Sequence, residues 1–145
     1  MKELSIRRER GFTLIELVVV VTIIGLLVGV VGLRYFGRIE PAKQTKAKQQ
    51  IEIFSTGLQM FYLDVGRYPT TEEGIKALRE KPSEAEGWKG PYLEKEIAPD
   101  PWGSPYVYKF PGEHGDYDLI SYGKDRVEGG EGENQDIVNW KDIEK

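Results

Sequence analysis

The sequence predicts an α+β fold in which one long N-terminal helix precedes a small C-terminal antiparallel β-sheet. Residues 12–33 are apolar apart from two threonines, one glutamate and three glycines. From residue 47 onwards, apolar residues recur at the spacing of a helix that buries one stripe. Two short runs rich in tyrosine and aliphatic residues follow nearer the C-terminus. A helix followed by clustered strands is typical of the α+β class.

The two apolar patterns together predict a single helix from about Phe12 to Leu63. The stripe in its second half consists of positions 47, 51, 54, 58, 61, 62 and 65, which fall on one face at 3.6 residues per turn. Pro41 lacks a backbone N–H, so a kink near Gly37–Arg38 is an expected consequence.

The remainder of the chain predicts shorter elements. Thr70 and Glu73 have the spacing of a capping box, which predicts a second, short helix that ends near Arg79 or Glu80. Two strands, the hairpin loop that joins them and a short closing segment are expected at 106–108, 117–122, 111–115 and 137–140, respectively.

Composition excludes several kinds of site. The chain has 20 Lys and Arg against 24 Asp and Glu, a net charge of −4, which gives no reason to expect nucleic-acid binding. The absence of cysteine removes disulfides, zinc–thiolate sites and thiol catalysis. A single histidine, His114, argues against a His-based metal site or a Ser-His triad. No nucleophile-elbow or phosphate-loop pattern is present, so we do not expect an enzyme.

The apolar run at 12–33 is long enough to span a bilayer. At ~1.5 Å per residue it reaches ~33 Å, against a hydrocarbon core of ~30 Å. Arg7, Arg8 and Arg10 precede the run, so the positive-inside rule puts the N-terminus in the cytoplasm and residues 34–145 on the other side. A plain single-pass anchor is one interpretation. A secretory signal peptide fits less well, because the run is too long and no small-residue cleavage site follows it.

Glu16 lies within the first turns of this apolar run. An ionised carboxylate in lipid costs a few kcal/mol, so an intramembrane acid is a functional-site hypothesis. We therefore expect Glu16 to need a partner that the chain itself does not contain. The glycines of the run either allow close approach of another helix or only lower helix stability, and the residues leave both interpretations open: Gly25, Gly29 and Gly32.

The residues around the start of the run resemble a known processing signal. Arg10-Gly11-Phe12-Thr13-Leu14-Ile15-Glu16 is similar to the signature of type IV pilins and pseudopilins. The resemblance implies that prepilin peptidase cleaves after Gly11, that residues 1–11 are a leader peptide, and that Phe12 becomes an N-methylated N-terminus. It also assigns Glu16 to filament assembly. Cleavage creates an amine at Phe12, with which the Glu16 carboxylate of a neighbouring subunit would pair when both are buried.

Five further phrases resemble the G-class major pseudopilins of the type II secretion system. They occur in the family's order and cover most of the chain after the leader: 63–74, 100–103, 111–115, 121–125 and 136–140. The resemblance implies a type IV pilin-like fold, in which residues 12–33 form the transmembrane and filament-core segment and 34–145 the periplasmic domain.

The same resemblance implies a structural function. The chain would be stored in the inner membrane as a single-pass protein and polymerise into a periplasmic pseudopilus that drives folded exoproteins through an outer-membrane secretin. The implied partners are other copies of the chain, prepilin peptidase, minor pseudopilins, the lipid bilayer, and an inner-membrane assembly platform with a cytoplasmic ATPase. The alternative is a type IV pilin of a surface fibre for adhesion, motility or DNA uptake.

The glycine- and acid-rich segment at 123–136 admits two interpretations. It is either a solvated loop or a calcium site, because Ca²⁺ takes 6–8 oxygens from carboxylates, amides and carbonyls. The resemblance favours structural Ca²⁺ in an ordered acidic loop, since G-class pseudopilins bind it there. Side-chain oxygens of Asp125 and Asp136 and the carbonyls of Tyr122 and Val127 are the ligands carried over by position. Where the family has a second acid, this chain has Gln135, with Asn134 or Glu133 as substitutes.

Overall fold

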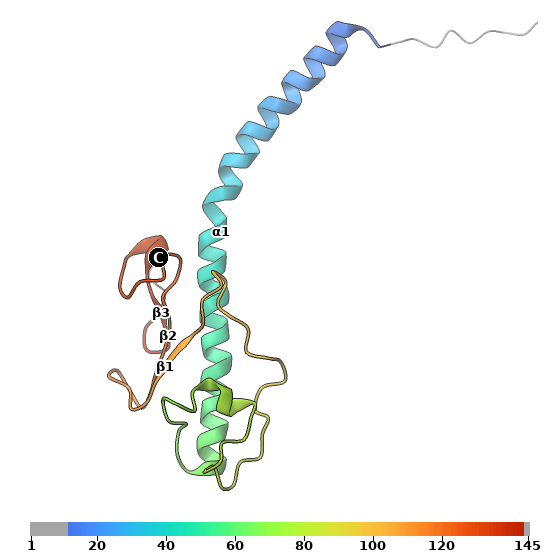
Figure 1. Cartoon of the computed structure of the whole chain (residues 1–145). Coiled ribbons are helices and arrows are strands. Elements are labelled where there is room, and N and C mark those ends of the chain that lie inside the picture. The colour runs from blue at the N-terminus through green and yellow to red at the C-terminus, as the bar shows by residue number, and fades with distance from the viewer. Residues whose placement is uncertain (1–11, 144–145) are drawn as a thin grey trace, which may run out of the picture. The chain divides into compact units, whose positions relative to one another are not determined.

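The computed structural model describes residues 12–143, and for residues 30–38 it describes the backbone alone. The chain divides into two compact units, Met1–Arg38 and Ile39–Lys145. Helix α1 (Leu14–Val65) contributes to both units (Figure 1). The second unit adds two 3₁₀ helices, η1 (Ile75–Leu78) and η2 (Gly132–Asn134), and three strands, β1 (Val107–Lys109), β2 (Asp118–Ser121) and β3 (Ile137–Val138).

The three strands form one antiparallel sheet in the order β1-β2-β3. Val107 pairs with Ile120 across the first ladder, and Ile120 pairs with Val138 across the second. All four residues of β2 are buried, as expected for the central strand. The α+β class and the C-terminal antiparallel sheet predicted from the sequence are confirmed. The first predicted strand lies one residue before β1, and the second extends one residue beyond β2 at each end.

The second half of α1 packs against the sheet and the connecting loops. Its buried face contains five of the seven residues predicted from the helical period: Ala47, Ile51, Phe54, Leu58 and Phe61. Val65 is partly buried against the same cluster, whereas Tyr62 is exposed and stacks on Tyr68 with ring centroids 4.8 Å apart. The helix begins and ends two residues later than predicted, and Pro41 lies inside it.

The second helix predicted after Thr70 is wrong, because a 3₁₀ helix of four residues takes its place. The capping box itself is present, because the Thr70 N–H donates to Glu73 Oε2 at 2.8 Å and the Glu73 N–H donates to Thr70 Oγ1 at 3.2 Å. Only turns and the short η1 follow it. Gly74, directly after the box, has φ 58° and ψ −167°, which no α-helix accommodates. The positive φ of one glycine therefore ends the helical geometry that the box begins.

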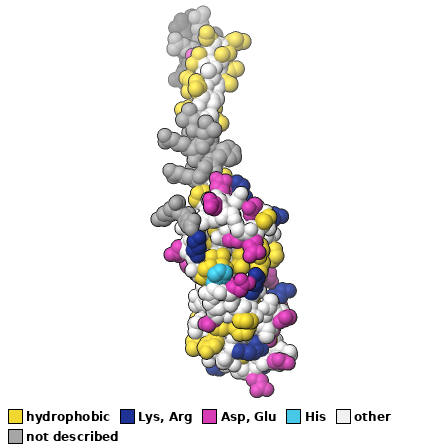
Figure 2. Space-filling view, turned by 90° about the vertical axis from the view of Figure 1, so that its left-hand side faces the viewer, with side chains coloured by type: hydrophobic (Ala, Val, Ile, Leu, Met, Phe, Trp, Pro, Cys, Tyr) yellow, Lys and Arg dark blue, Asp and Glu magenta, His cyan; other side chains and the backbone are white. Residues whose placement is uncertain are grey.

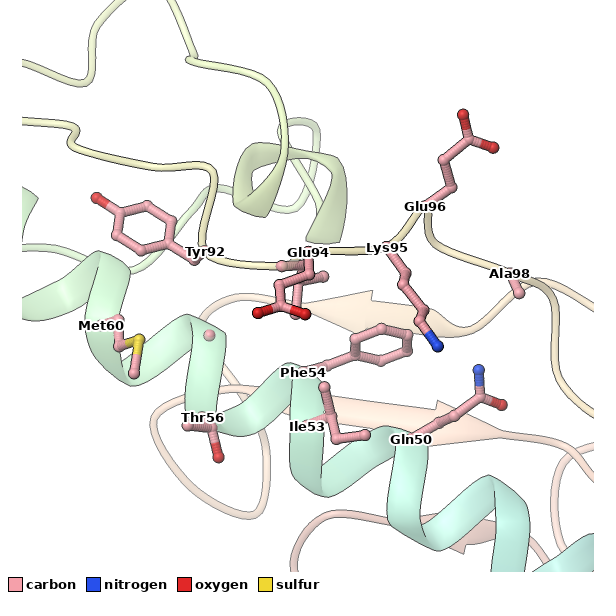
Figure 3. Close-up of a pocket in the computed structure, with 12 residues that line it drawn as sticks. Gln50, Ile53, Phe54, Thr56, Met60, Tyr92, Glu94, Lys95, Glu96 and Ala98 are labelled. Atoms are coloured by element: carbon pink, nitrogen blue, oxygen red, sulfur yellow. The ribbon is translucent and has the colours of Figure 1, made fainter.

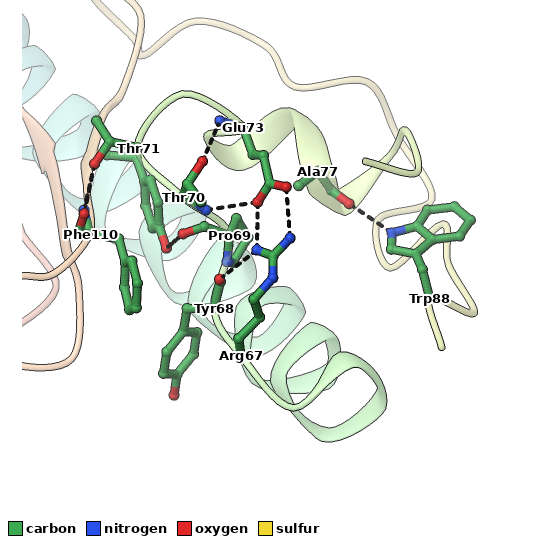
Figure 4. A network of polar contacts seen from close by, with 10 residues as sticks. Arg67, Tyr68, Pro69, Thr70, Thr71, Glu73, Ala77, Trp88 and Phe110 are labelled. Carbon is green, nitrogen blue, oxygen red and sulfur yellow. Dashed lines mark hydrogen bonds and ion pairs between the residues drawn. The ribbon is translucent and has the colours of Figure 1, made fainter. Parts of the chain in front are cut away.

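Arg67 clamps this turn to the end of α1. Its guanidinium makes a two-pronged contact with the Glu73 carboxylate, at 2.7 and 2.8 Å, and donates to the Tyr68 carbonyl at 3.0 Å (Figure 4). The hydrogen bond from Arg67 holds the pKa of Glu73 below its ordinary value of 4.5 against the opposing effect of burial, and the Thr70 N–H lowers that pKa further.

We expect this clamp to make the domain less stable in acid. Because the folded-state pKa of Glu73 is depressed, its contribution is fully present above about pH 4.5 and is lost as the pH falls through the folded-state value. Glu73→Gln should flatten the dependence of unfolding free energy on pH below 4.5, as measured by urea titration at a series of pH values. Glu72→Gln, at the neighbouring exposed position, should leave the dependence as in the parent. An unchanged profile for Glu73→Gln contradicts the prediction.

Candidate functional sites: the N-terminal helix and the acidic loop

The start of α1 is capped by the residues that surround Glu16. Glu16 Oε2 accepts hydrogen bonds from the Thr13 N–H and the Thr13 hydroxyl, both at 3.0 Å, and the Glu16 N–H donates to Thr13 Oγ1 at 3.3 Å. This is a reciprocal capping box. The chain therefore supplies hydrogen bonds to a carboxylate that we expected to depend on an outside partner. The Thr-x-x-Glu spacing was the signal that sequence reasoning missed.

The helical segment after the cap exposes its apolar side chains on every face. From Phe12 to Val28 the large hydrophobic residues are 46–84% exposed. A Cβ added at Gly25 or Gly29 would meet nothing within 4 Å. In Figure 2, yellow hydrophobic side chains surround the start of this segment at the top of the view. A contiguous apolar surface of this size marks contact with another molecule.

Two expectations at this end of the chain reach beyond what the structure describes. Gly11, the predicted last leader residue, lies outside the described residues. Within the described part of the chain, no helix has a stretch long and apolar enough to cross a membrane. The span over 12–33 therefore stays a prediction.

The acidic loop between β2 and β3 is a tightly folded segment. Several of its residues have φ in the left-handed region, and two of them are glycines against which the other arm of the loop packs. A Cβ on Gly123 would lie 2.9 Å from the Gln135 carbonyl oxygen, and a Cβ on Gly130 would collide with the Asn134 carbonyl oxygen. The loop thus brings its two arms together at the positions where the sequence suggested a metal ion.

Asp136 is the residue of this loop whose surroundings are unusual. Its Oδ2 accepts a hydrogen bond from the Gly129 N–H at 2.8 Å. Its Oδ1 is buried without a hydrogen-bond partner, the one such side-chain atom in the described residues. Burial raises the pKa of Asp136, and the charges of Asp125 and Glu128 raise it further against the effect of the Gly129 bond. A buried carboxylate oxygen facing like charges is what a bound cation would compensate.

The other predicted ligands lie along the same loop. Asp125 is exposed, and its Oδ1 accepts from the Val127 N–H at 3.2 Å. Asn134 is exposed in η2, Gln135 is buried, and Tyr122 is half-buried. Within the described residues, no three His, Cys, Asp or Glu side chains gather in an arrangement that would hold a metal. An ion at Asp136 would therefore need amide and backbone oxygens, and convergence of the Tyr122 and Val127 carbonyls on it stays a prediction.

Helix α1 anchors the loop and the strand after it. Gln44 Nε2 donates to the Gly132 carbonyl at 2.7 Å, and Lys48 Nζ donates to the carbonyls of Val138 and Lys141 at 2.9 and 2.7 Å. Sequence reasoning missed these residues. Their spacing of four places them on one helix face, but nothing local distinguishes them from solvent-exposed polar residues.

Among the described residues, His114 and Ser121 bond to different aspartates. His114 Nδ1 lies 3.0 Å from Asp118 Oδ2, and its ring stacks on Trp140 with centroids 3.9 Å apart. Ser121 Oγ donates instead to Asp100 Oδ2 at 2.6 Å, in a buried contact that also orders the Asp100 turn. These contacts attach hairpin and turn to the sheet.

Comparison with known proteins identifies the family. A model described as "Type II secretion system (T2SS), protein G" matches residues 34–140, and one described as "Prokaryotic N-terminal methylation motif" matches residues 6–32. The chain is 44% identical over 138 residues to type II secretion system core protein G of Pseudomonas aeruginosa, covering 92% of this chain and 96% of that protein. It is 42% identical over 139 residues to the Vibrio cholerae protein of that name, covering 94% of both.

A solved structure agrees with the sequence comparisons. The crystal structure of the major pseudopilin from the type 2 secretion system of enterohaemorrhagic Escherichia coli matches with a TM-score of 0.62 and 35% identity, over 72% of this chain and 92% of that one. The resemblance predicted from the leader and the five internal phrases is thus confirmed. The chain belongs to the type II secretion system protein G family.

Proposed function

We propose that this chain is the major pseudopilin of a type II secretion system, the repeating subunit of a periplasmic filament that drives folded exoproteins through an outer-membrane secretin. The observation that carries the proposal is the apolar helical surface from Phe12 to Val28, with Glu16 near its start, in a member of the protein G family. A helix that is apolar on all faces belongs in a hydrophobic environment. Copies of the same helix provide one when they pack together.

The methylation motif over residues 6–32 supports the maturation steps of this proposal. Prepilin peptidase removes residues 1–11 by cleavage after Gly11 and methylates the new amine of Phe12. Before assembly, the apolar segment anchors the chain in the inner membrane, with the domain in the periplasm. A platform with a cytoplasmic ATPase then extracts subunits into the filament, and minor pseudopilins complete it.

In this proposal, Glu16 sets how neighbouring subunits align along the filament. Its carboxylate accepts the capping bonds from Thr13, which supplies hydrogen bonds but no positive charge. The amine of Phe12 on a neighbouring copy supplies the opposite charge once the leader is removed. Because an unpaired buried charge is strongly unfavourable, subunits that are out of register are disfavoured.

The acidic loop is proposed to hold structural Ca²⁺. The buried, unpartnered Oδ1 of Asp136 supports this, since a calcium ion is an oxygen-seeking cation and would neutralise the repulsion from Asp125 and Glu128. Bound Ca²⁺ would hold the two arms of the acidic loop together in a chain that has no cysteine for a disulfide.

Deletion of the gene in the native host tests the function. Exoproteins should accumulate in the periplasm of the deletion strain and return to the medium when the full-length chain is supplied, as measured by immunoblotting of fractions. Twitching, adhesion and DNA uptake should be unaffected. Normal secretion together with loss of surface fibres would instead favour the alternative, a type IV pilin.

A further inference from the structure

An apolar groove runs between helix α1 and the extended segment 92–98. Its volume is about 520 Å³, and its apolar lining comes chiefly from Ile53, Phe54, Met60 and Leu93 (Figure 3). Ile53 is 56% exposed and Met60 is 49% exposed, so two large apolar side chains face solvent in the isolated subunit. The groove belongs entirely to the second unit, Ile39–Lys145.

The far wall of the groove is held firmly in place. Arg79 donates to the carbonyls of Leu93 and Glu94 at 2.7 and 2.8 Å, and the Tyr92 N–H donates to the Leu78 carbonyl at 2.7 Å. Gly57 lets α1 approach closely at the floor, because an added Cβ would lie 3.2 Å from Leu78 and 3.4 Å from Leu93. The groove is therefore a built feature and not a gap between mobile side chains.

The dimensions and charge of the groove suit a helix. The α1 residues that line it extend from Gln50 to Met60, which is ~15 Å or about three turns of helix. Glu94 and Lys95 at the opposite edge carry opposite charges, and the Glu96 side chain points away from the groove in Figure 3. The lining thus has no strong net charge and favours an uncharged, apolar ligand.

We propose that the groove receives the apolar helical segment 17–28 of a second copy of this chain. This inference rests on the proposed function, since filament assembly is what brings the copies together. The segment has no charged residue, and its one polar side chain, Thr22, donates its hydroxyl to the Val18 carbonyl at 2.7 Å. It therefore enters an apolar groove without an unsatisfied polar side chain. Gly25 narrows the helix and allows close approach.

Docking in the groove matches two apolar surfaces that are both exposed in one subunit. The groove exposes Ile53 and Met60, and segment 17–28 exposes its aliphatic side chains all round. A contact between different surfaces of identical subunits is heterologous, and such contacts repeat into open helical filaments when the rotation between subunits does not close a ring. The groove thereby provides a receiving surface for the segment as it leaves the membrane.

Site-specific photocrosslinking in assembled filaments of the full chain tests the inference. Benzoylphenylalanine at Met60 should give a crosslinked dimer whose partner peptide, identified by mass spectrometry, lies within residues 17–28. The control is the same amino acid at Glu52, an exposed position of α1 outside the groove lining, which should crosslink to that segment at least tenfold less. Crosslinks from Met60 to residues 39–143, to lipid or to another protein, or none at all, would overturn the proposal.

Charge insertion provides an independent measurement. Ile53→Asp and Met60→Asp should each lower the amount of filament at least tenfold, whereas Leu63→Asp, at an apolar position 73% exposed on the same helix but outside the groove, should lower it less than threefold. Equal losses at all three positions would overturn the groove as the specific contact. If the parent forms filaments but the crosslinks map elsewhere, only this inference fails, whereas absence of filaments from the parent contradicts the proposed function.

Discussion

Glu16→Gln is expected to lower the amount of assembled filament by a factor of roughly 30 to 4,000. In the proposed filament, the Glu16 carboxylate is buried and pairs with the amine of Phe12 on a neighbouring copy. Removing one member of a buried charge pair costs about 2–5 kcal/mol, and about 1.4 kcal/mol corresponds to a factor of ten. Filaments sheared from cells that produce the full chain can be quantified by immunoblotting and electron microscopy.

The capping geometry separates the charge of Glu16 from its local role. Glutamine serves as well as glutamate at the last residue of a capping box, helix position N3. Glu16→Gln therefore keeps the bonds to Thr13 while it removes the charge. Thr13→Ala does the reverse, because it removes the hydroxyl of the cap and keeps the carboxylate; its cost should be about 1 kcal/mol of helix stability. Assembly of Glu16→Gln at the parental level, or a larger defect for Thr13→Ala, would refute a pairing role for the charge.

Removal of calcium is expected to lower the melting temperature of the purified full chain by about 10–20 °C. At a Ca²⁺ concentration a hundredfold above its dissociation constant, binding to the folded state contributes about 2.7 kcal/mol. For a domain near 100 residues, about 1 kcal/mol corresponds to roughly 4–8 °C. Circular dichroism melts in Ca²⁺ and in excess chelator measure the difference, and Mg²⁺ should not restore the loss because it requires smaller, octahedral sites.

Two substitutions in the acidic loop locate the ion. Asp136→Asn should abolish the response to chelator, because it removes the carboxylate whose Oδ1 is buried and unpartnered. Glu131→Gln changes an exposed acid of the same loop that is not a predicted ligand, and its response should equal that of the parent. A parent protein whose melting temperature is insensitive to chelator would rule out the calcium site.

Short sequence patterns correctly predicted the helix and strands that depend on residues close together in the chain. The buried face of α1 followed from 3.6-residue periodicity, and the hairpin between β1 and β2 from strand patterns around a proline–glycine turn. The short helix after Thr70 was wrong because one backbone angle at Gly74 overrides the capping box, and a glycine accepts either sign of φ. Tyr62 fits the apolar period but lies at the edge of the stripe, where the packed loops leave it exposed.

The candidate sites also differ in whether residues close together in sequence were enough to predict them. The leader motif, Glu16 and the apolar run are contiguous in sequence, so their residue types and spacing sufficed to predict the helix. Its role in assembly was implied by the resemblance to the pilin and pseudopilin signature. The capping of Glu16 by Thr13 is also local and was available from the Thr-x-x-Glu spacing. The surroundings of Asp136 were not available, because its burial depends on how the loop folds back on itself between β2 and β3.

The sequence by itself determined the long helix, the α+β class and the family, since each rests on periodicity or on motifs within about a dozen residues. Only the tertiary structure decided how the acidic loop is held and where an apolar groove forms beside α1. Gln44 reaches Gly132 across 88 residues of chain, and the groove joins Met60 to a segment more than thirty residues away. Contacts between residues so far apart in sequence depend on how the helix and the loops pack together. Common polar and apolar side chains make these contacts, so no short sequence pattern predicts them.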